Sequence, residues 1–191
     1  SVAGLYSAGE AAGHGGVFGA DRVGGAIGAC MVLGSRAGYS AAQYALESDN
    51  KGPTEKMIKE EIRNLGGLYK HKGIHVCGVT KETREFAGRY LSVLREEQSL
   101  SRTVEKLKQY RLEPIESEKD PFAAVEAKSL ALTGEMIARS ALMRKESRGQ
   151  HNRSDCPAQD NEKYRARIII RSKKDSSEEL ILKKEELSSS I

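Results

Sequence analysis

The sequence has no apolar run of the roughly 18 residues that a membrane-spanning helix requires. Its longest stretch rich in glycine and alanine, residues 24–45, is interrupted by the polar side chains of Ser35, Arg36 and Gln43. The N-terminus lacks the basic segment and apolar stretch of a secretory signal peptide, and it also lacks an initiating methionine. We therefore expect no membrane span, and we expect the chain to begin inside a longer one.

Cysteine is scarce as well. Cys30, Cys77 and Cys156 show no C-x-x-C spacing, which argues against a zinc site and against a disulfide framework. His71 and His75 have no carboxylate or cysteine companion at metal-ligand spacing. We therefore predict no metal site, and a reducing, cytoplasmic compartment.

Charge of one sign is not concentrated anywhere in the chain. The formal net charge of +4 combines two basic and four acidic residues in positions 1–50 with 29 basic and 23 acidic residues after position 50, where the two signs are mixed, as in KKDSSEELILKKEE. Such mixing is typical of solvated helix and hairpin faces, whereas nucleic-acid binding needs a cationic patch. We expect no nucleic-acid partner.

Glycine divides the sequence into two kinds of structure, because 11 of the 19 glycines fall in residues 1–38. Residues 4–9 are half apolar and predict a short strand, which a glycine-rich loop connects to a helix over residues 25–46. Small residues on that helix would let a neighbouring backbone or a flat ligand come close.

Helical signals dominate from Pro53 to residue 148. One apolar stripe ends at Gly66, residues 68–82 have no clear pattern, and two stripes between Phe86 and Arg111 indicate one bent helix or two consecutive ones. Asp120 before a proline predicts the N-cap of a long helix. The spacing predicts an antiparallel bundle of three or four helices. Its expected core residues are Phe86, Tyr90, Leu107, Val125, Leu130 and Ile137.

The tail changes to a two-residue period. Tyr164, Ala166, Ile168 and Ile170 alternate with arginines, and KKDSS separates them from a second apolar run, which predicts a terminal β-hairpin. The predicted fold class is therefore α+β: a strand, glycine-rich loop and helix, then a helical bundle, then a hairpin. The expected divisions are residues 1–50, 53–150 and 151–191.

A strand, glycine-rich loop and helix in this order is a common way of holding phosphates or electron-rich rings at a helix N-terminus. The loop matches neither G-x-G-x-x-G nor a P-loop, so spacing alone does not support a nucleotide phosphate site. Glycines that serve only close packing remain the alternative at this point.

Two separate blocks carry a family resemblance. The first is GLYSAGEAAGHGGVFGADRVGGAIGACMVLGSRAG, and the second, about 120 residues later, is ALMRKESRGQHNRSDCPAQD. Both resemble the C-terminal part of the succinate dehydrogenase/fumarate reductase flavoprotein family, which includes L-aspartate oxidase. The resemblance implies an FAD-dependent oxidoreductase that exchanges hydride between flavin and a small dicarboxylate. It also implies that the chain works only together with the family's FAD-binding and capping portions. A further iron–sulfur partner and peripheral attachment to the inner face of a membrane are implied in the same way.

The resemblance also assigns residues. Glu10 falls on the glutamate that binds a ribityl hydroxyl of FAD, and Arg22 falls on the arginine that binds a substrate carboxylate, for which a guanidinium fork is well matched. Ala26, Ile27 and Gly28 fall where the helix start faces the pyrimidine edge of the flavin.

The remaining matches and the departures from the family pattern leave alternatives open. For Glu146, Arg148, His151 and Arg153 we favour a structural role over direct ligand binding. Phe18 and Asp21 stand where the family has histidine and asparagine, and the segment with Ala26 lacks the family's asparagine and serine. The resemblance therefore does not assign the substrate. A non-catalytic docking module derived from the family is the rival interpretation.

Overall fold

The structure is a computed structural model. It describes residues 2–16, 26–49, 52–70, 72–117, 120–173 and 176–186. Two compact units are present: Ser1–Glu55 with Arg148–Gln150, and Lys56–Ser147 with His151–Ile191. Within the described residues, no helix combines the length and the hydropathy needed to cross a membrane.

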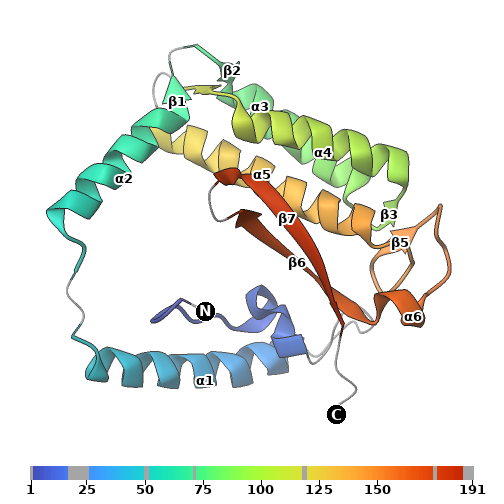
Figure 1. Ribbon diagram of the computed structural model, residues 1–191, viewed down its shortest axis with the longest axis horizontal. Coiled ribbons are helices and arrows are strands. Elements are labelled where there is room, and N and C mark those ends of the chain that lie inside the picture. Colours follow the sequence, from blue (N-terminus) through green and yellow to red (C-terminus); the bar gives the residue numbers. More distant parts are fainter. Residues whose placement is uncertain are drawn as a thin grey trace. The chain divides into compact units, whose positions relative to one another are not determined.

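The first unit contains the 3₁₀ helix η1 (Gly9–Gly16) and the helix α1 (Ala26–Glu47), drawn in blue in Figure 1. The start of α1 confirms the helix that the sequence predicts from about residue 25. The first turn of α1 carries no acidic residue and its last turn no basic one, so its own side chains leave the helix dipole uncompensated.

The strand predicted over residues 4–9 is wrong. Residues 2–8 have no regular structure, and η1 takes over at Gly9. Gly4 and Gly9 have φ angles of 78° and 65°, outside the range of an extended strand. An alternating pattern also needs a neighbouring strand to pair with, and the segment has none among the described residues of this chain.

The second unit is built on three helices, α3 (Val76–Tyr90), α4 (Glu97–Leu112) and α5 (Pro121–Met143), which lie side by side and alternate in direction (Figure 1). Asp120 Oδ1 accepts hydrogen bonds from the backbone N of Phe122 at 2.9 Å and of Ala123 at 3.3 Å, which confirms the predicted cap of α5. The apolar stripe of α2 (Glu55–Leu68) stays largely exposed.

The bundle core differs from the predicted set. Of the six expected residues only Leu107 is fully buried, and Ile137 is 45% exposed. Instead, α5 buries a face of alanines: Ala124, Ala127, Ala131, Ala138 and Ala141. A Cβ added at Gly134 would lie 2.6 Å from Leu107 Cδ1, so α5 has approached α4 too closely for large side chains. Phe86, Tyr90, Val125 and Leu130 lie on the flanks, half-buried.

The prediction that residues 68–82 are irregular is also wrong. This segment contains the strands β1 (Tyr69–Lys70) and β2 (Ile74–His75) and the first turns of α3. Both strands pair in parallel with β4 (Ile115–Glu116), which lies between them. Their partner lies about 40 residues further along the chain, so no local pattern could reveal the pairing.

Two further sheets complete the unit. The strand β3 (Leu94–Arg95) pairs in parallel with β5 (Asn152–Arg153), so the apolar stripe that reaches Leu94 leaves the helix at Tyr90. The short helix α6 (Asn161–Tyr164) leads into β6 (Ala166–Lys173) and β7 (Ser176–Glu186), an antiparallel pair in the region where the sequence predicts a hairpin.

Candidate functional site

The first candidate site lies where η1 meets α1. A Cβ added at Gly9 would lie 2.7 Å from Cys30 Sγ, and the φ of Gly9 is positive, so only glycine fits here. This contact seats the start of η1 on the second turn of α1. Glu10, the next residue, is exposed in the first turn of η1.

The described part of the chain leaves the first turn of α1 exposed. Ile27 is 80% exposed, and among the described residues no atom outside the helix's own turn lies within 4 Å of the position that a Cβ of Gly28 would take. The first backbone N–H groups of a helix have no partner within the helix and attract electron-rich groups. The backbone N–H groups of Ala26, Ile27 and Gly28 belong to this helix start, and Glu10 supplies a carboxylate in the same unit.

Arg22, the residue expected to bind substrate, lies outside the described residues. So do Phe18 and Asp21, two of the residues that depart from the family pattern. Their roles stay predictions.

The second block forms a polar network that we call the arginine junction. It consists of Arg95, Arg144, Glu146, His151, Arg153 and Asp155. Arg148, which the sequence grouped with these residues, is half-buried and belongs to the first unit. The six residues of the arginine junction all lie in the second unit.

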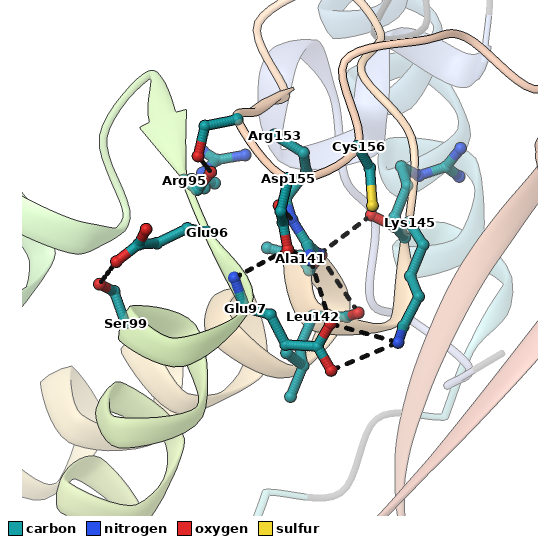
Figure 2. Close-up of polar contacts among 12 residues, drawn as sticks. Arg95, Glu96, Glu97, Ser99, Ala141, Leu142, Lys145, Arg153, Asp155 and Cys156 are labelled. Carbon is teal, nitrogen blue, oxygen red and sulfur yellow. Dashed lines mark hydrogen bonds and ion pairs between the residues drawn. The ribbon is translucent and has the colours of Figure 1, made fainter.

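Arg153 is the centre of the junction and is 1% exposed (Figure 2). Its Nε and Nη2 donate to Asp155 Oδ1 and Oδ2 at 2.7 and 2.6 Å. Its Nη1 donates to Ala141 O at 2.9 Å, among the carbonyls that end α5. The guanidinium thus binds a carboxylate bidentately while it caps a helix C-terminus, where positive charge is favourable.

Asp155 connects this pair to the next helix. Its Oδ2 accepts from Glu97 N at 3.1 Å, at the start of α4, whose own N-cap residue Glu96 makes no side-chain cap. The hydrogen bonds from Arg153 lower the pKa of Asp155 from 3.8 to about 2. Lys145 Nζ lies 3.3 Å from Glu97 Oε1 at the rim. The end of α5 and the start of α4 are therefore held together by the Arg153–Asp155 ion pair, with the Lys145–Glu97 pair beside it.

Glu146 joins the end of α5 to the tail. It is fully buried; its Oε1 accepts from Arg144 Nη1 at 2.5 Å, and its Oε2 accepts from Asp160 N at 2.8 Å. Arg144 Nη2 also donates to Ala166 O at 2.6 Å, at the first residue of β6. The buried carboxylate of Glu146 is therefore paired with groups of the same chain.

His151 is 8% exposed and contacts two elements. Its Nδ1 lies 2.7 Å from Arg95 Nη1, and its Nε2 lies 3.0 Å from Arg144 O. Burial, together with nearby guanidinium groups, lowers the pKa of His151 below its ordinary value. The partners found for Glu146, His151 and Arg153 are groups of the chain itself, an arrangement that favours support of the fold over ligand binding.

Several polar groups of the second unit escaped the sequence analysis. Glu135 is fully buried on the alanine face of α5, between Arg111 Nε and Arg139 Nε, each at 2.7 Å. The sequence signal for this buried acid is its spacing: Glu135 lies four residues after Ala131 and three before Ala138, on the same face of the helix. Tyr110 donates a short hydrogen bond to Glu82, and this bond lowers the pKa of Glu82.

A separate open hollow of about 590 Å³ lies between α3 and the first turn of α5. It is lined by Val76, Cys77, Thr80, Lys81, Arg84, Glu85 and Ala123. It contains none of the residues that the sequence singled out for binding. Among the described residues, no group of three or more histidines, cysteines or acids is placed to hold a metal ion.

With this geometry, the class of protein can be stated. Residues 80–190 match the family described as "Fumarate reductase flavoprotein C-term", which covers more than half of the chain. The chain belongs to this family, as the two sequence blocks predict.

Among individual relatives, an uncharacterized FAD-dependent oxidoreductase of Methanocaldococcus jannaschii is 34% identical over 184 residues, which cover 91% of this chain and 32% of the relative. A fumarate reductase (CoM/CoB) subunit of Methanothermobacter marburgensis is 32% identical, over 80% of this chain and 29% of the relative. The chain thus spans about a third of the length of these relatives.

Solved structures share the fold at lower identity. The Mycobacterium smegmatis Sdh1 complex in its apo form aligns with a TM-score of 0.70 and 22% identity, over 86% of this chain and 30% of that chain. A quinol-fumarate reductase with menaquinol molecules aligns with a TM-score of 0.68 and 17% identity, over 86% and 31%.

Proposed function

We propose that this chain is the C-terminal portion of an FAD-dependent oxidoreductase of the succinate dehydrogenase/fumarate reductase type, and that its first unit forms one side of the flavin pocket. The observation that carries the proposal is the first turn of α1, which has no acidic residue and is exposed at Ile27 and Gly28 among the described residues, with the carboxylate of Glu10 in η1, which packs on α1 through Gly9. Membership of the flavoprotein family supports the same assignment.

Each residue of the first unit then has a distinct task. Glu10 accepts hydrogen bonds from ribityl hydroxyls, because an ionised carboxylate has several acceptor positions. The backbone N–H groups of Ala26, Ile27 and Gly28 face the pyrimidine edge, where negative charge is favoured near a helix N-terminus. When bound, the flavin supplies the hydride chemistry, and the chain supplies orientation and electrostatics.

Substrate binding falls to Arg22. A guanidinium fork holds one carboxylate of a small dicarboxylate through two parallel charge-assisted hydrogen bonds, and it keeps its charge at every accessible pH. Asp21, next to it in sequence, would offset part of that charge. The proposed substrate class is therefore small dicarboxylates, with succinate and fumarate as the first pair to test.

The proposed partners follow from the length of the chain. It spans about a third of its relatives, so the FAD-binding and capping portions must complete the pocket. One relative is named as one subunit of its enzyme, and one solved structure is a complex. We propose that an iron–sulfur subunit exchanges electrons with the flavin, in the cytoplasm or on the inner face of a membrane to which partner subunits attach the protein.

A non-catalytic docking module of the same family is the second candidate. The observation that favours it is the replacement of family residues by Phe18, Asp21 and Ala26 in the block that should contact flavin and substrate. In that case the helical unit and the hairpin would retain the fold without the chemistry.

The flavin content of the natural-length protein distinguishes the two candidates. We expect yellow protein with one flavin per copy of this chain, and we expect Glu10→Ala to lose flavin on gel filtration. Glu47→Ala is the matched control, since Glu47 is an exposed acid at the far end of α1. Colourless protein that does not take up added FAD would favour the docking module.

A further inference from the structure

His151 is held between two groups whose hydrogen-bonding roles cannot change. Arg95 Nη1, 2.7 Å from Nδ1, only donates, and Arg144 O, 3.0 Å from Nε2, only accepts. Nδ1 must therefore be the bare, accepting nitrogen and Nε2 must carry the proton. The imidazole is neutral, in one defined tautomer.

The charges around the ring oppose a second proton. Three guanidinium groups act on it: Arg95 from β3, Arg144 from the C-cap of α5, and Arg153 from β5. The carboxylates of the junction are already engaged, Glu146 by Arg144 and Asp155 by Arg153. A proton on Nδ1 would place two donors and two positive charges face to face.

Arg95 depends on this bond. Its Nε is buried with no hydrogen-bond partner among the described residues, and its Nη2 donates to Leu91 O at 2.9 Å, which ends α3. Without His151 as an acceptor, this half-buried guanidinium would keep, within the described part of the chain, only its hydrogen bond to Leu91 O. Leaving such a group unsatisfied is costly.

The bond also secures the pairing of β3 with β5. Asn152 N donates to Val93 O at 3.3 Å, and Ser154 N donates to Arg95 O at 2.9 Å. The pairing spans only two residues on each strand, so it depends on side-chain support. We propose that His151 is a pH-dependent latch: protonation of its ring releases Arg95 and opens the β3–β5 pairing. This inference does not depend on the proposed flavin chemistry.

The direction of the effect follows from linkage. Burial first, and then the three guanidinium groups, lower the pKa of His151 in the closed state below its ordinary value of 6.5. Between those two values the open state binds more protons than the closed one, so the closed state loses stability as the pH falls. Above the ordinary value the latch is fully closed.

Hydrogen exchange on the natural-length protein tests the latch without any activity measurement. Exchange at Asn152 and Ser154 is compared at pH 7.5 and pH 5.0, after correction for the chemical rate at each pH. We expect a further acceleration of up to about 30-fold at pH 5.0, the ceiling that linkage sets for one group whose pKa in the open state is 6.5. Peptides from the middle of α5 should show no such step.

Variants assign the step to His151. His151→Gln keeps an acceptor for Arg95 and a donor for Arg144 O but cannot titrate, so it should exchange slowly at both pH values. His75→Gln is the control, because His75 lies at the N-cap of α3 and should keep the wild-type step. Arg95→Met should exchange fast at both values. An unchanged step in His151→Gln, or no step in the wild-type protein, would overturn the proposal.

Discussion

Arg153 holds both carboxylate oxygens of Asp155, at 2.7 and 2.6 Å, while the same guanidinium closes the last turn of α5. The arrangement compensates a buried charge twice, with a counter-charge and with helix carbonyls. This geometry makes the pair strongly interdependent, because removing either partner leaves the other uncompensated.

The first prediction concerns Arg153→Lys. A lysine keeps the charge but cannot bind two carboxylate oxygens and the carbonyls of α5 together. We expect the free energy of unfolding to fall by about 3–5 kcal/mol in denaturant titrations. Lys163→Ala, at an exposed ion pair with Asp160, should change it by less than about 0.5 kcal/mol. Equal effects of the two variants would show that the junction carries no special weight.

The second prediction is an acid limit set by Asp155. Its pKa falls from 3.8 to about 2 on folding, so the pair stabilises the fold fully above about pH 4 and loses that contribution as the pH drops toward 2. Allowing for its partly exposed oxygens, we expect a loss of about 1–2 kcal/mol across this window. Asp155→Asn should be less stable at pH 7 and should lack this part of the acid limb. A parallel acid limb in both proteins would contradict the assignment.

The third prediction tests the close packing of α4 and α5. Gly134→Ala gains helix propensity but forces a Cβ to within 2.6 Å of Leu107 Cδ1. Overpacking should outweigh the gain, for a net loss of about 1–2 kcal/mol measured by thermal or chemical unfolding.

Gly88→Ala is the matched control for that change. Among the described residues, no atom outside its own helix turn lies within 4 Å of a Cβ at Gly88 in α3, so this variant should be neutral or stabilised by up to about 1 kcal/mol. Leu107→Val should relieve part of the cost of Gly134→Ala in the double variant. A stabilised Gly134→Ala protein would mean that the helices can separate freely.

The fourth prediction concerns Arg22 in the active, natural-length protein. Arg22→Ala should lower turnover of a dicarboxylate substrate at least about 100-fold while FAD stays bound, since two charge-assisted hydrogen bonds are lost where orientation decides the reaction. Arg36→Ala, in the exposed part of α1, is the control. Wild-type turnover in Arg22→Ala would show that the family role has not carried over, with a salt bridge to Asp21 as the remaining explanation.

Local chemistry was enough to predict some elements of the fold. Asp120 followed by Pro121 defines the start of α5, because an accepting side chain and a fixed φ act within three residues. The change from glycines to helix-compatible residues likewise locates the start of α1 at Ala26. The strand expected over residues 4–9 failed, since strand formation depends on a partner that periodicity cannot name.

The sequence by itself determined the family, the helical character of residues 121–143 and the set of polar residues in the second block. Only the tertiary structure decided what those polar residues do. Asp155 accepts a hydrogen bond from the backbone N of Glu97 at the start of α4, although the two residues are 58 positions apart. His151 lies against Arg95, which is 56 positions away in sequence. Such hydrogen bonds depend on which helix ends the packing brings together. The alanines on α5 allow α4 to pack closely against it. This close packing determines which side chains are buried in the core and which charged residues pair.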